Sequence, residues 1–286
     1  MTRRQLMLGA MAAATAKPAE SKTVFCFFSK YLQDFKYDDL GKALHDAGFG
    51  GVDLTVRPGG HVLPERAADD LPRAFEAIRS HGVQVPMIST GLVSANDPSA
   101  RPILKTAARL GIPYFKLGYY KWGKDLAGTL AEVKSSLQGL VELAKEYGIT
   151  AGFHNHVGYV GQALWDVNPI VSGLDATRLG YYYDFDHAVV VGARDSWQVT
   201  LRLASPRLKI VAVKDFNWVK SASGWQTEAC PLGQGAVNWG KAFTALAEYK
   251  YAGPISIHQE YKPADRLASA HQDLEFAMRH MQAAKT

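Results

Sequence analysis

The segment ITAGFHNH, residues 149–156, carries the pattern of a buried strand that ends in two histidines. It follows residues 126–147, which place apolar side chains at helical spacing, and this change from helix to strand is typical of an alternating α/β fold. Side chains alternate along a strand, so His154 and His156 point to the same side. A single buried histidine is more often structural. Two at one strand end indicate a metal site, because neutral imidazole is the commonest metal ligand.

Outward from this segment, strand patterns and helix patterns alternate eight times along the chain. We expect strands at residues 22–28, 51–56, 83–90, 114–118, 149–153, 179–184, 208–213 and 254–257. We expect helices at residues 37–47, 67–80, 100–110, 126–147, 165–174, 196–203, 239–249 and 266–284. Eight such units predict parallel strands, right-handed crossovers and a closed (β/α)8 TIM barrel. An open doubly wound sheet is the alternative, but no G-x-G-x-x-G motif follows the first strand.

The composition is that of an ordinary globular protein, with 286 residues of which 47% are hydrophobic and 21% charged. No low-complexity tract or linker divides the chain, so we predict one barrel domain over residues 22–286. The net charge is +5, but no basic stripe with interleaved aromatic residues is present, which argues against a nucleic-acid partner. The two cysteines, Cys26 and Cys230, match neither a disulfide framework nor a zinc motif.

Residues 1–16 have the pattern of an export signal. Arg3 and Arg4 precede a short apolar run, residues 8–16, which closes in Ala-Thr-Ala. Adjacent arginines indicate the twin-arginine type, so we expect an exported, periplasmic protein from which residues 1–16 are removed. The run is too short to span a membrane, so no membrane span is expected in the mature chain. A frayed N-terminal tail is the alternative.

Polar residues collect where most of the predicted strands end, and (β/α)8 enzymes carry their chemistry at these ends. From the second strand to the eighth they are Asp53, Arg57, Ser89, Thr90, Lys116, His154, Asn155, His156, Asp184, Asp186, His187, Lys214, Asp215, His258 and Glu260. Each alone has an ordinary explanation, such as a turn or a strand end. Together they indicate a site, because like groups buried close together cost energy unless a cation or a ligand compensates them.

The chain resembles the xylose isomerase-like TIM barrels, a family of sugar-phosphate isomerases and epimerases that also contains endonuclease IV-like enzymes. The pieces that carry the resemblance are GVDLTVR at residues 51–57, HNH at 154–156, Asp184-x-x-His187, VKD at 213–215 and IHQEY at 257–261. The Asp-x-x-His and Lys-Asp pieces are moderately specific in this order and spacing, and each alone is weak. The resemblance covers nearly the whole chain after the N-terminal segment and implies the same closed barrel.

Members of this family typically hold one divalent metal ion with a Glu, an Asp, a His and a Glu from the fifth to the eighth strand. Only Asp184 matches this pattern, and other residues stand at the remaining positions: His154, Ala212 and His258. The resemblance therefore implies either a rebuilt metal site or a site that has lost its metal. We predict the rebuilt site, with the ligands His156, Asp184, His258 and Glu260. Mixed nitrogen and oxygen ligands favour Zn²⁺, Mn²⁺, Co²⁺ or Fe²⁺ over Mg²⁺ and Ca²⁺.

The resemblance implies a metal-dependent isomerase or epimerase that moves a proton on the carbon next to a carbonyl. Glu260 is the expected base, and Lys214 and His187 are expected to stabilise the oxyanion or return the proton. The same enolate could expel a neighbouring oxygen, so a keto-glycoside lyase stays open, as does a sugar-binding barrel without catalysis. Phosphodiester cleavage of the endonuclease type is disfavoured, because it needs more metal ligands than the sequence offers.

The expected substrate is a free sugar or keto-sugar, because an exported enzyme meets few phosphorylated sugars. Aromatic faces pack well on sugar rings, and polar groups at the strand ends can bind hydroxyl groups. The residues expected to bind substrate are Arg57, His61, Lys116, Asn155, Asp215 and Trp218. The sequence leaves open whether the protein forms a homodimer.

Overall fold

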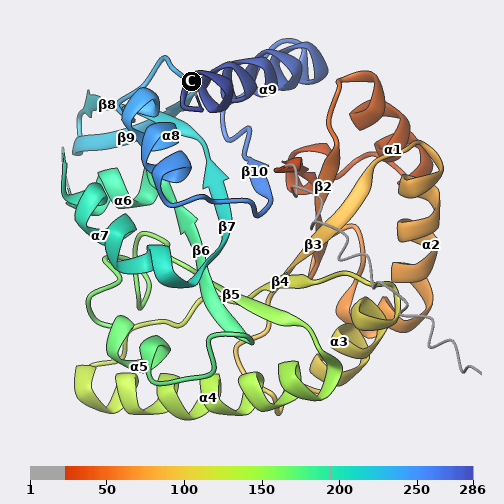
Figure 1. Ribbon diagram of the computed structural model, residues 1–286, viewed down its shortest axis with the longest axis vertical. Helices are drawn as coiled ribbons and strands as arrows, with labels where there is room; N and C mark the ends of the chain where they lie inside the picture. The colour runs from red at the N-terminus through yellow and green to blue at the C-terminus, as the bar shows by residue number, and fades with distance from the viewer. Residues whose placement is uncertain (1–22, 193–194, 286) are drawn as a thin grey trace, which may run out of the picture.

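Eight parallel strands close into a barrel in the computed structural model of this chain, which describes residues 23–192 and 195–285 (Figure 1). Around the barrel the strand order is β1-β10-β7-β6-β5-β4-β3-β2. The strands are β1 (Phe25–Phe28), β2 (Gly51–Val56), β3 (Gln84–Thr90), β4 (Tyr114–Lys116), β5 (Thr150–His154), β6 (Leu179–Asp184), β7 (Leu208–Val213) and β10 (Ile255–Ile257). The predicted closed (β/α)8 barrel is confirmed, and the open sheet is excluded.

Helices surround the barrel and cover the outer faces of its strands (Figure 1). They are α1 (Tyr37–Asp46), α2 (Ala67–Ser80), α3 (Ala100–Arg109), α4 (Leu126–Tyr147), α5 (Asn168–Ser172), α6 (Phe185–Gly192), α7 (Ser196–Ala204), α8 (Trp239–Glu248) and α9 (Arg266–Ala283). The long helix α4 buries Val133, Leu137 and Leu140 at helical spacing. It ends at Gly148, whose φ of 71° is the left-handed conformation that glycine adopts most easily. Strand β5 follows at once and leads to the site.

A hairpin after β7 was not foreseen in the sequence. It consists of β8 (Asp215–Ser221) and β9 (Gly224–Cys230), which pair antiparallel over their whole length. Most of its side chains are exposed or half-buried, so the apolar pattern of a buried strand is missing there. Cys230 lies at the end of β9, and both Cys26 and Cys230 are unpaired.

The helices after β5 and β6 also differ from expectation. The helix expected at residues 165–174 is reduced to α5, whose first turn contains Pro169. Proline is tolerated in a first turn because its missing N–H has no partner there in any case. Helix α6 begins directly after Asp184, in a sequence that is equally typical of a turn. This immediate start brings the first turn of α6 to the end of β6, beside the other strand ends.

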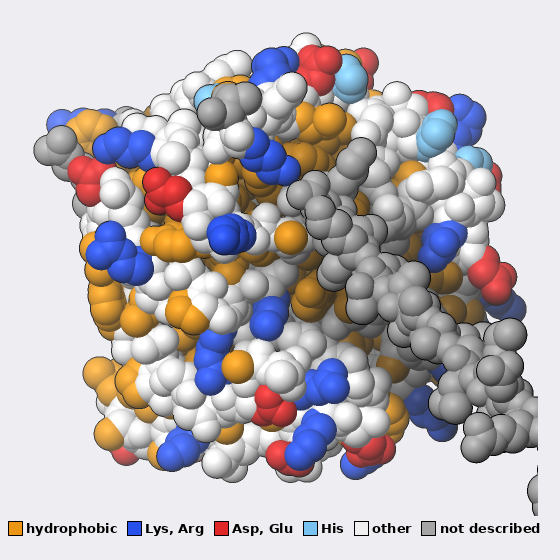
Figure 2. Space-filling model, viewed as in Figure 1, with side chains coloured by type: hydrophobic (Ala, Val, Ile, Leu, Met, Phe, Trp, Pro, Cys, Tyr) orange, Lys and Arg blue, Asp and Glu red, His pale blue; other side chains and the backbone are white. Residues whose placement is uncertain are grey.

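The predicted export signal, residues 1–16, lies outside the described residues, so it stays a prediction together with the exported location. In the part of the chain that the structure describes, no helix is long and apolar enough to cross a membrane. On the face shown in Figure 2, lysine and arginine side chains are scattered among hydrophobic and uncharged ones. The described residues of this face form no basic stripe of the kind that binds nucleic acid.

The interior of the barrel contains a carboxyl group. Met87, Tyr182, Ile210 and Ala212 form a small apolar cluster that is separate from the larger core under the helices. Asp53 is fully buried beside it, and Asp53 Oδ2 accepts hydrogen bonds from the Tyr182 hydroxyl and the Ser256 hydroxyl, both at 3.0 Å. Burial raises the pKa of Asp53 above its ordinary value, although these hydroxyls act in the opposite direction. Tyr182 precedes Asp184 by two residues on β6, so this layer forms the floor of the site.

Gly118→Ala should destabilise the fold by about 2–3 kcal/mol, because overpacking against the main chain has no cheap relief. A Cβ atom at Gly118 would overlap the carbonyl oxygen of Gly91 and lie 2.7 Å from its carbonyl carbon. Gly91→Ala is the matched control, since its Cβ would meet only Pro58 Cδ, at 3.9 Å. Urea unfolding of both variants measures the difference. Equal stabilities would show that the loops after β3 and β4 can separate without cost.

Candidate functional site

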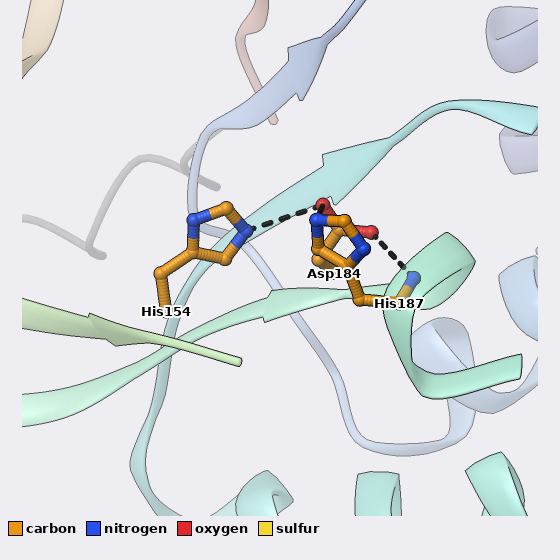
Figure 3. A group of neighbouring side chains, drawn as sticks. All are labelled: His154, Asp184 and His187. Atoms are coloured by element: carbon orange, nitrogen blue, oxygen red, sulfur yellow. Dashed lines mark hydrogen bonds and ion pairs between the residues drawn. The ribbon is translucent and has the colours of Figure 1, made fainter. Parts of the chain in front are cut away.

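Asp184 is the centre of a buried cluster at the C-terminal ends of β5, β6 and β7 (Figure 3). Its position is fixed through the main chain: the Asn155 side chain accepts from Asp184 N–H at 2.8 Å and donates to Asp184 O at 3.0 Å. Asp184 Oδ1 accepts from His187 N–H at 3.1 Å, as an N-cap residue of α6 would. Asn155, which was expected to bind substrate, therefore positions Asp184 instead.

His154 lies beside Asp184 as a neutral imidazole. His154 Nε2 is 3.2 Å from Asp184 Oδ2, and His154 Nδ1 is 3.1 Å from the Tyr119 hydroxyl. Burial lowers the pKa of His154 well below its ordinary value, more than the carboxylate of Asp184 raises it. An ionised carboxylate can only accept, so Nε2–H donates to Asp184 and the Tyr119 hydroxyl donates to Nδ1. Both ring nitrogens of His154 are therefore in use.

Lys214 inserts its ammonium group into the same cluster. Its Nζ lies 3.0 Å from His187 Nε2, 3.0 Å from Glu260 Oε1, 3.6 Å from Asp184 Oδ2 and 4.0 Å from Asp186 Oδ1. Burial alone would lower the pKa of Lys214, but the three carboxyl groups outweigh it and raise the pKa above its ordinary value. Lys214 is therefore charged and donates to His187 Nε2.

Glu260 connects this cluster to the mouth of the barrel. Its Oε1 accepts from the Tyr31 hydroxyl at 2.9 Å and from Lys214. Burial alone would raise the pKa of Glu260, but the Lys214 ammonium lowers it, so the carboxylate is ionised. The side chain of Glu260 is 37% exposed, whereas that of Lys214 is 3% exposed. Within the described part of the chain no group bonds Oε2, which leaves one carboxylate oxygen open to a bound molecule.

His156 and His258 have other partners. His156 Nδ1 donates to the carbonyl of Val157 at 2.9 Å, and burial lowers the pKa of His156 to about 4. His258 Nε2 lies 3.0 Å from the hydroxyl of Tyr182. That hydroxyl donates its one proton to Asp53, so it accepts from His258 Nε2–H. Burial lowers the pKa of His258 well below its ordinary value, and both imidazoles are neutral.

The predicted metal ligands do not come together as a group. Among the described residues, the group whose donor atoms all lie within 4.8 Å of one another consists of His154, Asp184 and His187. Of the four predicted ligands only Asp184 belongs to it, because His156 turns to a carbonyl, Tyr182 holds His258, and Lys214 lies between Asp184 and Glu260. Two features of the sequence could have identified His154 and His187 as members of this group. His154 stands at the strand position of the family Glu, and Asp-x-x-His places His187 in the first turn after Asp184.

The group of His154, Asp184 and His187 could hold a metal ion as far as donor type is concerned, since two imidazoles and a carboxylate suit zinc-like ions. The space beside these atoms, however, contains the Lys214 ammonium, at 3.0 Å from His187 Nε2 and 3.6 Å from Asp184 Oδ2. An ion bound to both atoms would lie against a like charge. With Lys214 charged, the residues present do not fit a divalent ion.

Lys116 is the second buried lysine of the site, and its setting is the opposite of that of Lys214. Its Nζ lies over the ring of Tyr119, 3.5 Å from the centroid. In the described part of the chain it has no carboxylate within ion-pair distance. Burial lowers the pKa of Lys116 to about 7, with a further contribution from the nearby cations Arg57 and Lys30. Near neutral pH Lys116 is therefore an amine that can carry or release a proton.

Two of the other residues expected to bind substrate serve the fold instead. The oxygens of Asp215 accept from four backbone N–H groups and from the Trp239 indole, so none is free for a ligand. His61 contacts strand β2 through Thr55 Oγ1, at 3.2 Å, and the short 3-10 helix after β1 through Leu32 O, at 3.1 Å. Arg57 lies over the ring of Phe28, 5.5 Å from its centroid. Trp218 is 47% exposed on the hairpin strand β8.

Comparisons with known proteins agree with this fold. The model of the xylose isomerase-like TIM barrel family matches residues 42–282. The inosose dehydratase of Halalkalibacterium halodurans is 27% identical over 157 residues, which are 51% of this chain and 50% of that protein. The chain thus spans about half the length of the curated relatives it matches.

Solved structures extend the likeness of fold over nearly the whole chain. The 3-keto-D-glucoside 4-epimerase of E. coli superposes with a TM-score of 0.71 at 14% identity, over 90% of this chain and all of that one. A xylose isomerase-like TIM barrel protein from Mycobacterium smegmatis, in complex with magnesium, gives a TM-score of 0.69 at 14% identity, over 92% of this chain and 98% of that one. The match of the family model over most of the chain decides the assignment. This chain belongs to the xylose isomerase-like TIM barrel family.

Proposed function

We propose that this protein is a sugar-modifying enzyme, an isomerase or epimerase that moves a proton on the carbon next to the carbonyl of a free sugar or keto-sugar. The observation that carries the proposal is the pair of Glu260 and Lys214, a carboxylate whose Oε1 lies 3.0 Å from a buried ammonium and whose Oε2 is open. A base beside a fixed cation suits enolisation, because negative charge develops on the carbonyl oxygen as the proton leaves the carbon. The sugar epimerase and the inosose dehydratase among the similar proteins support this class.

In this scheme Glu260 takes the proton from the carbon, and Lys214 stabilises the enolate oxygen. Protonated Glu260 then returns the proton to the neighbouring carbon, which gives an isomer, or a second acid protonates the opposite face of the enolate, which gives an epimer. Lys116 is a second proton carrier, since burial lowers its pKa to about 7. The dependence on a divalent metal ion that the family resemblance implies stays a prediction, and no step of this scheme requires it.

A keto-glycoside lyase or dehydratase is the second candidate. Its first step is the same, but the enolate then expels an oxygen from the next carbon, and an acid supplies the proton to the leaving group. The setting of Lys116 favours this option, because a half-protonated amine at the site can donate that proton. The inosose dehydratase relative supports it too. The products separate the candidates: epimerisation conserves the formula of the sugar, whereas elimination releases water or an alcohol.

Glu260→Gln should slow proton exchange at the substrate carbon by about 10²- to 10⁴-fold, the usual contribution of a general base. The assay incubates the protein with ketohexoses, inososes and 3-keto-glycosides in D₂O and follows deuterium incorporation by NMR. Glu275→Gln is the control, since Glu275 lies exposed on α9, where it pairs with Arg279. Undiminished exchange in Glu260→Gln would reject Glu260 as the base. Sugar binding without exchange in the unaltered protein would instead favour the non-catalytic sugar-binding barrel.

A further inference from the structure

We infer that the ammonium group of Lys214 is the resident cation of this site and fills the place where the family resemblance implies a divalent metal ion. The inference deepens the proposed function, because it names the group that stabilises the enolate oxygen. It rests on the contacts of Lys214 Nζ, on the charges around it, and on the state of the atoms that a metal ion would need.

The contacts of Lys214 are those of a bound cation. Its Nζ has Glu260 Oε1 and His187 Nε2 at 3.0 Å, and Asp184 Oδ2 at 3.6 Å. These partners come from three separate parts of the barrel, namely the end of β6, the first turn of α6 and the segment after β10. The Lys214 side chain is 3% exposed, so water does not take the place of any of them. The site therefore already contains a desolvated positive charge with carboxylate partners.

The charges around this position match an ammonium better than a divalent ion. Within the group that could hold a metal, Asp184 is the one acidic residue, beside two histidines. Asp184 Oδ2 and Glu260 Oε1 are the nearest carboxylate oxygens to Lys214 Nζ, at 3.6 Å and 3.0 Å. Ala212, which faces the interior of the barrel near the end of β7, offers no donor atom.

The donor atoms themselves are engaged. Both nitrogens of His154 are bonded, one to Asp184 and one to Tyr119. His187 Nε2 accepts from Lys214, and His258 Nε2 bonds to Tyr182. A metal ion would have to displace the Lys214 side chain and change the tautomer of His154. Removing the charge of Lys214 by mutation should therefore open the site to a metal ion.

The test is a titration of chelator-treated protein with Zn²⁺, Mn²⁺ and Co²⁺ in the absence of substrate, followed by calorimetry and by thermal unfolding. We expect the unaltered protein to bind each ion no more tightly than about 1 mM, with an unchanged midpoint of unfolding. Lys214→Met should bind one ion per chain roughly tenfold or more tightly, because the like charge is gone. Lys214→Arg keeps the charge and should behave like the unaltered protein. Lys220→Met, on the exposed face of β8, is the control.

Tight binding of one metal ion per chain to the unaltered protein would overturn the inference. This result does not depend on a variant, so it decides the question even if Lys214→Met fails to fold. Because the titration contains no sugar, it is independent of the proposed function. If the protein had no sugar activity and bound no metal, the proposed function would be wrong and the inference about Lys214 would stand. If the protein were active but needed a bound metal ion, the proposed function would stand and the inference about Lys214 would be wrong.

Discussion

Lys116→Met should unfold with a free energy about 2–4 kcal/mol higher than that of the unaltered protein at pH 7. The Lys116 side chain is buried at the end of β4, and burial together with Arg57 and Lys30 lowers its pKa from 10.5 to about 7. Each pH unit between these values corresponds to 1.4 kcal/mol of free energy of unfolding. The expected gain stays below the full difference, because the face of the Tyr119 ring attracts the ammonium form.

The sign of the pH dependence follows from the same values. Between about pH 7 and 10.5 the unfolded chain binds a proton at Lys116 that the folded chain does not, so the stability of the unaltered protein rises with pH. The advantage of Lys116→Met is therefore complete at pH 7 and below, and it disappears as the pH approaches 10.5. Urea unfolding at several pH values measures this difference.

Lys105→Met is the matched control for Lys116→Met, because Lys105 is exposed on α3 and should show no such trend. If the difference in free energy of unfolding between Lys116→Met and the unaltered protein stayed constant with pH, packing and not charge would be its cause. A stabilised variant with reduced sugar activity would mean that the fold gives up stability to keep an amine at the site.

The barrel could be predicted because each of its strands is an apolar run next to a helical pattern. β2, for example, is buried over its whole length, and β5 begins two residues after the glycine that ends α4. The hairpin of β8 and β9 could not be found in this way. Most of its side chains are exposed or half-buried, so its two strands show no continuous apolar run in the sequence. The prediction thus succeeded where burial determines the residue type.

For the site, the sequence identified the strand ends but not the partners of each side chain. Alternation places His154 and His156 on one side only while the strand continues, and β5 ends at His154. His156 lies beyond that end, where it turns to the carbonyl of Val157. The place of Lys214 between Asp184 and Glu260 depends on side chains from strands that are far apart in the sequence. No local pattern encodes such a contact.

Asp184→Asn should lower the free energy of unfolding by about 3–5 kcal/mol, the usual cost of removing one partner of a buried ion pair. Asp184 is fully buried, and although burial alone would raise its pKa, His187 and Lys214 hold that pKa well below its ordinary value. Both carboxylate oxygens accept from N–H groups, one from His154 and one from His187. An amide would turn its NH₂ group toward one of these donors and would leave the Lys214 charge with fewer partners.

A second substitution shows whether the loss comes from the charge of Lys214. The double variant, Asp184→Asn with Lys214→Met, contains no unpaired ammonium. Its loss of free energy of unfolding should therefore be smaller than the sum of the losses in the two single variants, by a coupling energy of about 1–3 kcal/mol. Asp186→Asn is the control, because Asp186 Oδ1 lies farther from Lys214 Nζ, at 4.0 Å, than Asp184 Oδ2 does, at 3.6 Å, so its loss should cost less. If the losses of free energy of unfolding were additive, Asp184 would stabilise the strand ends only through its contacts with Asn155 and α6. The Glu260 carboxylate alone would then compensate the charge of Lys214.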